Sequence, residues 1–120
     1  MENEIKVKSL HKALEILNCF VGKDSLGVTE ISERFGLCKS NVHNILYTFR
    51  QMGYLEQNEA TGKYRLGMQI FVLCKGLSDS FPIARIALPS MQELSDRAGE
   101  RVYLGIPCGW EVFYLDSTSP

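Results

Sequence analysis

The sequence contains few cysteines, and none lies at a spacing that binds metal or supports redox chemistry. The four cysteines occupy positions 19, 38, 74 and 108, so no Cys-x-x-Cys pair is present. No signal-like segment opens the chain either. We therefore expect reduced thiols in a cytoplasmic protein without metal or cofactor, with Cys38 and Cys74 serving as packing residues.

Long apolar runs and catalytic motifs are also missing from the sequence. The longest apolar runs are far shorter than the roughly 18 to 20 residues of a membrane span, so no membrane partner is expected. His11 or His43 could act as a base beside a cysteine, but no nucleophile elbow, phosphate loop or paired acidic motif surrounds them. The sequence therefore indicates a folded protein that is not an enzyme.

The chain has no large excess of either charge, because 13 basic and 14 acidic residues nearly cancel. The average hides a gradient along the sequence. Residues 1–33 carry four basic and six acidic side chains, residues 34–67 carry five and two, and residues 68–120 carry four and six. The middle segment is therefore positive, with a net charge of +3. A local positive block is the electrostatic footprint that binding to a nucleic acid needs, although by itself it is weak evidence.

Three stretches near the N-terminus have the apolar spacing of amphipathic helices. In "SLHKALEILNCFVG", Ser9 is a candidate N-cap, and in "VTEISERFG" Thr29 has the same role before Gly36 ends the helix. The third stretch, "LCKSNVHNILYTFRQMG", follows almost at once. Two helices joined by a Gly-containing turn, after another helix, predict a helix-turn-helix. The residues expected to face the core are Leu10, Ala13, Leu14, Leu17 and Phe20, then Ile31 and Phe35, then Val42, Ile45, Leu46 and Phe49.

The third helix of this pattern would be the recognition helix, which enters the major groove of DNA. At 100° per residue, its small polar side chains point away from the apolar face. Asn can pair with adenine, and Ser or Thr can contact bases or phosphates. For His43 and Tyr47, a solvated helix face is an equally good interpretation. The candidate DNA contacts are Thr29, Lys39, Ser40, Asn41, His43, Asn44, Tyr47 and Thr48.

The segment "YLEQNEATGKYRLG" predicts a β-hairpin directly after this helix. Residues 58–62 form the turn, where Gly62 supplies the permissive backbone. Period-two alternation places Lys63 and Arg65 on one face, while Tyr64 and Leu66 cover the core from its open side. The hairpin would then be a wing that aims two cations at flanking phosphate or minor groove.

The remaining sequence predicts a helix, a second helix and another hairpin. "MQIFVLCKGLSD" has an apolar stripe of Ile70, Phe71, Cys74 and Leu77, and Phe81 and Pro82 end it. A helix from 82 to 98 contains Pro89, which should kink it, and Gly99 ends it. "RVYLGI" and "EVFYLD" flank "PCGW" as a hairpin.

Together these motifs resemble the IclR family of transcriptional regulators. The resemblance rests on "SLHKALEIL", "TEISERFGL", "KSNVHNIL" and "GYLEQNEATGKYRLG", and it continues through "ALPSMQELSDRAGERVYLGI" and "GWEVFYLD". It implies an α+β chain with a winged helix-turn-helix DNA-binding domain at 1–67 and a linker helix at 68–81. Residues 82–120 would be the first helix and hairpin of an incomplete effector-binding domain, as in the front half of a longer protein.

The resemblance further implies a homodimer on palindromic double-stranded DNA, with the linker helix pairing through Ile70, Phe71, Cys74 and Leu77. A small-molecule effector is expected only for a full-length form. The alternative is a winged-helix module for protein interaction or dimerisation, since a fold alone does not fix a function. An interaction module should carry an apolar or acidic recognition face, whereas this face carries Lys39, Ser40, Asn41, Asn44, Lys63 and Arg65.

Overall fold

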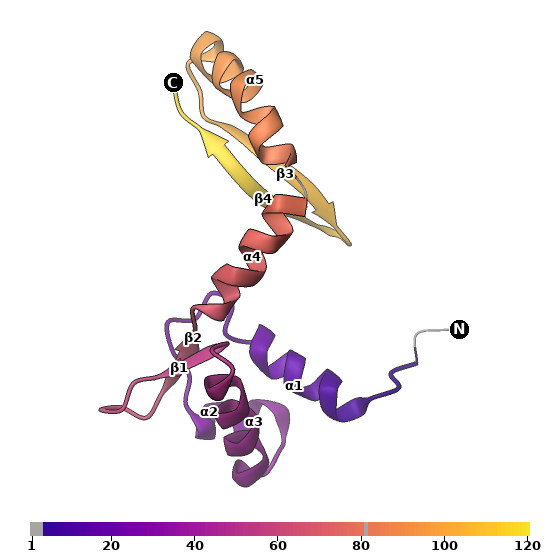
Figure 1. Cartoon of the computed structure of the whole chain (residues 1–120), viewed down its shortest axis with the longest axis vertical. Helices are drawn as coiled ribbons and strands as arrows, with labels where there is room; N and C mark the ends of the chain where they lie inside the picture. Colours follow the sequence, from indigo (N-terminus) through magenta and orange to yellow (C-terminus); the bar gives the residue numbers. More distant parts are fainter. Residues whose placement is uncertain (1–3, 81) are drawn as a thin grey trace. The chain divides into compact units, whose positions relative to one another are not determined.

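The computed structural model describes residues 4–80 and 82–120, and it confirms a chain of mixed helices and small antiparallel sheets (Figure 1). Its contacts separate two compact units, Met1–Leu73 and Cys74–Pro120. The first unit contains α1 (Lys8–Asn18), α2 (Val28–Phe35), α3 (Lys39–Gln51), β1 (Leu55–Gln57) and β2 (Tyr64–Leu66). Helix α4 (Gln69–Ser80) begins in the first unit and ends in the second. The second unit continues with α5 (Ile83–Ala98), β3 (Val102–Cys108) and β4 (Glu111–Thr118).

Helix α1 contributes to the core through its C-terminal half. Ile16, Cys19 and Phe20 are buried, whereas Leu10 and Leu14 remain 56% and 45% exposed. The prediction of a core face through Leu10 and Leu14 was therefore wrong. The physical reason is that α1 and α3 leave an open groove between them, so Leu10 and Leu14 line its wall instead of packing in the core. The helix also begins at Lys8 after Val7, so Ser9 is not the cap.

Helix α2 begins two residues earlier than the sequence indicated. Its N-cap is Gly27, and Thr29 lies within the first turn, so the predicted Thr29 cap was wrong. The Glu30 carboxylate instead accepts a hydrogen bond of 2.9 Å from the Gly27 N–H, satisfying one backbone donor at the helix start. At the other end, Gly36 adopts the left-handed conformation with φ of 64°, as a C-terminal glycine should.

Helix α3 packs with the face that its periodicity predicted. Val42 and Leu46 are fully buried, and Ile45 and Phe49 pack against the same core. The core is completed from the other helices and from the hairpin. It consists of Ile16, Cys19, Phe20, Ile31, Val42, Leu46, Leu55 and Tyr64.

The predicted wing is a short antiparallel hairpin. Strands β1 and β2 pair Leu55 with Leu66, Glu56 with Arg65, and Gln57 with Tyr64. Tyr64 is buried and its backbone also exchanges hydrogen bonds of 2.8 and 2.9 Å with Leu26, which fixes the base of the hairpin. Leu66 is 37% exposed, so the expectation that it covers the core was wrong. It lies at the end of the two-stranded sheet, where the chain turns away toward α4.

The second unit consists of α5 and the hairpin of β3 and β4. Pro89 lies inside α5, and Gly99 ends the helix in the left-handed conformation. Thr118 of β4 donates a hydrogen bond of 3.2 Å to the Met91 carbonyl of α5, and both residues are buried. The strands extend further than predicted, leaving only Gly109 and Trp110 between them. Pro107 and Cys108 therefore belong to β3, and Gly109 takes the positive φ of 63° that the tighter turn requires.

Helix α4 ends at Ser80, and the predicted break at Phe81 lies outside the described residues. None of the helices in the described ranges is long and apolar enough to cross a membrane. Within the same ranges, no three His, Cys, Asp or Glu side chains are grouped as a metal site.

Candidate nucleic-acid interface

The exposed face of α3 carries the polar side chains predicted to read DNA. Burial of Val42 and Leu46 on one side of the helix fixes its rotation, so the opposite side faces solvent. The structure brings these candidates together on one helix and leaves them all exposed. They are Lys39, Ser40, Asn41, His43, Asn44, Tyr47 and Thr48. Thr29 is exposed in the first turn of α2.

Two contacts organise this face. The rings of His43 and Tyr47, one turn apart, stack with their centroids 6.5 Å apart and an angle of 26° between their planes. The Thr48 hydroxyl donates a hydrogen bond of 2.8 Å to the Asn44 carbonyl, so its proton is used within the helix while its lone pairs remain available. The exposed face therefore offers the Asn41 and Asn44 amides, which can donate and accept hydrogen bonds, together with the stacked rings of His43 and Tyr47.

The two wing cations are paired with carboxylates, which the sequence analysis did not anticipate. The Arg65 Nε lies 3.1 Å from the Glu56 carboxylate, and the Lys63 Nζ lies 3.5 Å from that of Glu30. All four side chains are largely exposed, and exposed pairs of this kind contribute only about 0 to 1 kcal/mol. Phosphate groups could therefore replace the carboxylates at small cost in free energy.

Neither pair could be read from the predicted turn. Glu56 faces Arg65 directly across the hairpin, whereas a five-residue turn at 58–62 would have placed Glu56 opposite Tyr64. The pair between Lys63 and Glu30 joins the wing to α2, and only the tertiary structure shows it. By contrast, the structure gives Lys39 no ion pair within residues 4–80 and 82–120, and its side chain is exposed.

The pKa of Glu30 is lowered from its ordinary value. The main cause is the hydrogen bond from the Gly27 N–H, and the Lys63 ammonium adds to it, while slight desolvation opposes both. Glu30 is therefore an anion at neutral pH, placed at the positive N-terminal end of α2. It both starts the helix and holds the wing cation Lys63.

Comparison with known proteins assigns this architecture to a family. Residues 9–59 match the IclR helix-turn-helix domain, which covers α1 to the start of the wing. The chain is 38% identical over 111 residues to the HTH-type transcriptional regulator XynR of Escherichia coli K12, covering 92% of this chain and 44% of that protein. The chain belongs to the IclR family. It spans less than half the length of the curated relatives that it matches.

Solved IclR structures align with this chain over most of its length. An IclR-family regulator from Brucella abortus aligns with a TM-score of 0.83 and 31% identity, covering 99% of this chain and 47% of that one. An IclR homologue from Microbacterium hydrocarbonoxydans, complexed with 4-hydroxybenzoate, aligns with a TM-score of 0.77 and 28% identity over 92% of this chain and 46% of that one.

The apolar stripe of α4 in this IclR-family chain is exposed. Phe71 is 68% exposed and Leu77 is 59% exposed, and Cys74 also faces solvent while Ile70 is half-buried. No residue of α4 is buried. The expectation that Cys38 packs within the chain was wrong, because its thiol is exposed, whereas Cys74 is exposed in the single chain on the stripe predicted to pair with a second copy. Cys19 is the cysteine that packs in the core.

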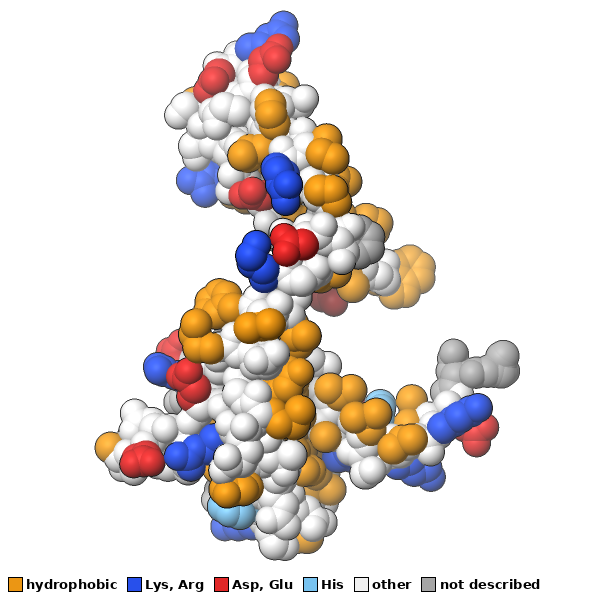
Figure 2. Space-filling model, in the orientation of Figure 1, with side chains coloured by type: hydrophobic (Ala, Val, Ile, Leu, Met, Phe, Trp, Pro, Cys, Tyr) orange, Lys and Arg blue, Asp and Glu red, His pale blue; other side chains and the backbone are white. Residues whose placement is uncertain are grey.

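A second apolar surface was missed by the sequence analysis. The exposed residues of α1 lie beside Ile45 and Phe49 of α3 and form an open groove with Leu73. Figure 2 shows hydrophobic side chains exposed along α1. Asn44 and Thr48 line the rim of this groove, so these two candidates border an apolar surface as well as solvent. The signal in the sequence was the apolar face of α1 through Leu10 and Leu14, which the sequence analysis had assigned to the core.

Proposed function

We propose that this chain is a DNA-binding transcriptional regulator acting in the cytoplasm, and that α3 is its recognition helix. The observation that carries the proposal is the polar, solvent-facing side of α3 from Lys39 to Thr48, held in place by the buried Val42 and Leu46. The N-terminal residues of such a helix contact base edges in the major groove. Family membership supports this role, because the curated relatives are transcriptional regulators.

The side chains divide into those that specify sequence and those that position the protein. The Asn41 and Asn44 amides can pair with adenine, and Ser40 can contact a base or a phosphate. Lys39 is the cation best placed for a phosphate, since its ammonium is exposed and unpaired within the described residues. On this proposal Lys63 and Arg65 reach phosphate by exchanging their carboxylate partners.

We further propose that the protein binds as a homodimer to a roughly palindromic operator. The support is the exposed stripe of Ile70, Phe71, Cys74 and Leu77, because an apolar helix face of this kind favours a partner helix over water. A two-fold dimer matches the symmetry of a palindrome. For a full-length form, small organic or aromatic acids are the effector class to test, since one structural neighbour was solved with 4-hydroxybenzoate.

Selection of bound fragments from genomic DNA, at two salt concentrations, tests the proposal. We expect an enriched motif with two related halves and a loss of affinity as salt increases. Asn44→Ala should relax base preference at one position of each half, whereas Lys39→Ala should weaken binding to all sequences similarly. Asn18→Ala, an exposed amide at the end of α1, is the matched control and should change neither. Binding without sequence preference or salt dependence would refute the proposal and favour a protein-interaction module.

A further inference from the structure

The base and the tip of the wing are held by different interactions. The base is anchored by the buried side chains of Leu55 and Tyr64. The tip is ordered internally, because the Asn58 Oδ1 accepts hydrogen bonds from the N–H groups of Ala60 and Thr61, at 2.9 and 3.2 Å. Beyond the last strand pair, Gln57 and Tyr64, the backbone bonds only within the turn: the Asn58 N–H donates to the Lys63 carbonyl at 2.8 Å, and the Gly62 N–H donates to the Asn58 carbonyl at 2.7 Å. The core alone therefore does not fix the direction in which the tip points.

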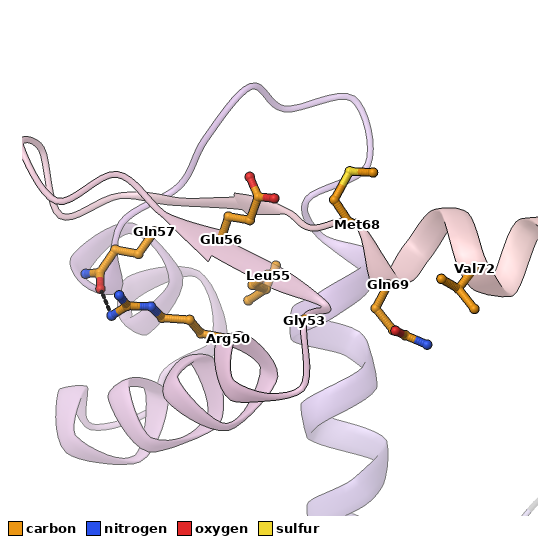
Figure 3. Close-up of a pocket in the computed structure, with 8 residues that line it drawn as sticks. All are labelled: Arg50, Gly53, Leu55, Glu56, Gln57, Met68, Gln69 and Val72. Carbon is orange, nitrogen blue, oxygen red and sulfur yellow. Dashed lines mark hydrogen bonds between the residues drawn. The ribbon is translucent and has the colours of Figure 1, made fainter.

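Side-chain hydrogen bonds from the end of α3 help to hold the direction of the wing tip. Arg50, in the last turn of α3, donates from Nη1 to the Gln57 Oε1 at 2.7 Å (Figure 3). The Gln57 Nε2 in turn donates to the Gly62 carbonyl at 3.1 Å, across the turn of the wing. A second guanidinium nitrogen, Nη2, lies 3.3 Å from the Glu59 carboxylate. The end of α3 is thus linked to both sides of the wing tip.

The chemistry of each group suits this connection. Gln57 uses its oxygen as acceptor and its NH₂ group as donor at the same time, so a single amide bridges a cation and a carbonyl. The bond from Arg50 is charge-assisted and short, which makes it the stronger of the two. Arg50 is also half-buried, so solvent competes less for its guanidinium than for the exposed Arg65.

We propose that Arg50 is a positioning residue, which holds the wing in a fixed direction relative to α3 through Gln57. Its consequence for DNA rests on the proposed function: the Lys63 carbonyl accepts a hydrogen bond from the Asn58 N–H at the start of the turn, so the direction of the tip sets which phosphate Lys63 reaches. Lys cannot replace Arg here, because only the planar guanidinium presents two donors in a fixed fork to Gln57 and Glu59.

The order of the tip in the free protein tests the positioning directly. Backbone ¹⁵N relaxation should give order parameters near 0.85 for residues 58–62 of the original chain. We expect values below about 0.6 for the same residues in Arg50→Lys and in Gln57→Ala. Gln57→Glu keeps an acceptor for Arg50 and removes the donor to Gly62, so it should loosen the tip while the Arg50 side chain stays ordered.

The controls separate positioning from a general loss of structure. Gln69→Ala removes an amide that lines the same hollow as Arg50 but is not hydrogen-bonded to it, and it should leave the tip unchanged (Figure 3). Order parameters for α2 and α3 should stay at their original values in all four variants. A tip that is as ordered in Arg50→Lys and Gln57→Ala as in the original chain would overturn the proposal.

Binding to a selected DNA fragment gives an independent readout. If Arg50 positions the wing, Arg50→Lys should weaken binding about three- to tenfold although the charge is kept, and adding Lys63→Ala should weaken it no further. If Arg50 instead contacts phosphate directly, Arg50→Lys should bind as the original chain does, and that result would count against positioning. An original chain that binds no DNA would refute the proposed function, while the relaxation data would still decide the role of Arg50.

Discussion

Neutralising Glu56 should tighten DNA binding, because this carboxylate competes with phosphate for Arg65. The two groups are 3.1 Å apart on facing strands, and the pair is exposed, so Glu56→Gln should change the free energy of unfolding by less than about 1 kcal/mol. The substitution removes one negative charge beside the expected DNA backbone. It leaves an amide of nearly the same shape.

The gain in affinity follows from the geometry of the pair. A phosphate on the far side of the Arg65 guanidinium would lie about 6 Å from the Glu56 carboxylate, where repulsion in water is about 0.7 kcal/mol. Breaking the ion pair adds up to about 1 kcal/mol. Together these terms predict roughly three- to twentyfold tighter binding for each wing at low salt. Freeing Arg65 should also steepen the dependence of log K on log salt by up to about one unit for each wing.

Fluorescence anisotropy with a selected DNA fragment, titrated at several salt concentrations, measures both quantities. The matched control is Glu93→Gln in the second unit, which breaks an exposed ion pair with Arg97 at 3.4 Å and makes the same change in net charge. If Glu56→Gln binds no more tightly than Glu93→Gln and has the same salt slope, the competition between carboxylate and phosphate does not exist.

Three further predictions concern stability and assembly. Because the pKa of Glu30 is lowered in the folded state, its contribution to stability is present above roughly pH 4.3 and lost as pH falls through the lowered value. Urea unfolding at pH 6 should therefore show Glu30→Gln as less stable than the original chain, with the difference shrinking as the pH falls through the lowered pKa of Glu30, and equal stability at pH 6 would contradict this. Gly67→Ala should cost about 1 to 3 kcal/mol in urea unfolding, since its Cβ would meet backbone atoms leading into β1, whereas Gly76→Ala has open space and should cost nothing. Phe71→Glu should yield monomers in sedimentation velocity with the helical content of residues 8–51 kept, and Val72→Glu, on the opposite side of α4, should stay dimeric; a dimeric Phe71→Glu would place the interface elsewhere.

The sequence allowed the elements of the first unit to be predicted because their signals are local. The spacing of Val42, Ile45, Leu46 and Phe49 predicts a helix that buries one side, and this prediction does not require knowing which elements pack against that side. Gly36 and Gly62 mark positions where the backbone takes positive φ, a property of the single residue. The same locality explains why the polar face of α3 could be named in advance, since the buried side fixes the exposed one.

Predictions failed where two faces or two neighbouring starts were equally consistent with the local pattern. Helix α1 has apolar residues on two sides, and only the placement of the other helices decides that Ile16 is buried and Leu10 is not. Thr29 and Gly27 are both acceptable near a helix start, and the Glu30 carboxylate favours the start after Gly27 through its hydrogen bond. Cys74 is apolar enough to pack, but nothing in the single chain covers it.

The sequence by itself therefore determined the order of the helices and strands, the polar exposed face of α3, and the presence of a hairpin that carries Lys63 and Arg65. Only the tertiary structure decided which carboxylates pair with the wing cations and which side chains hold the direction of the wing. Lys63 meets Glu30 across 33 residues of chain, and Arg50 reaches Gln57 and Glu59 across a helix end and a strand. Such contacts depend on how the buried core, above all Leu55 and Tyr64, places α2, α3 and the hairpin relative to one another. Periodicity along the chain reports which side of an element is buried, and it does not report the distance between two elements.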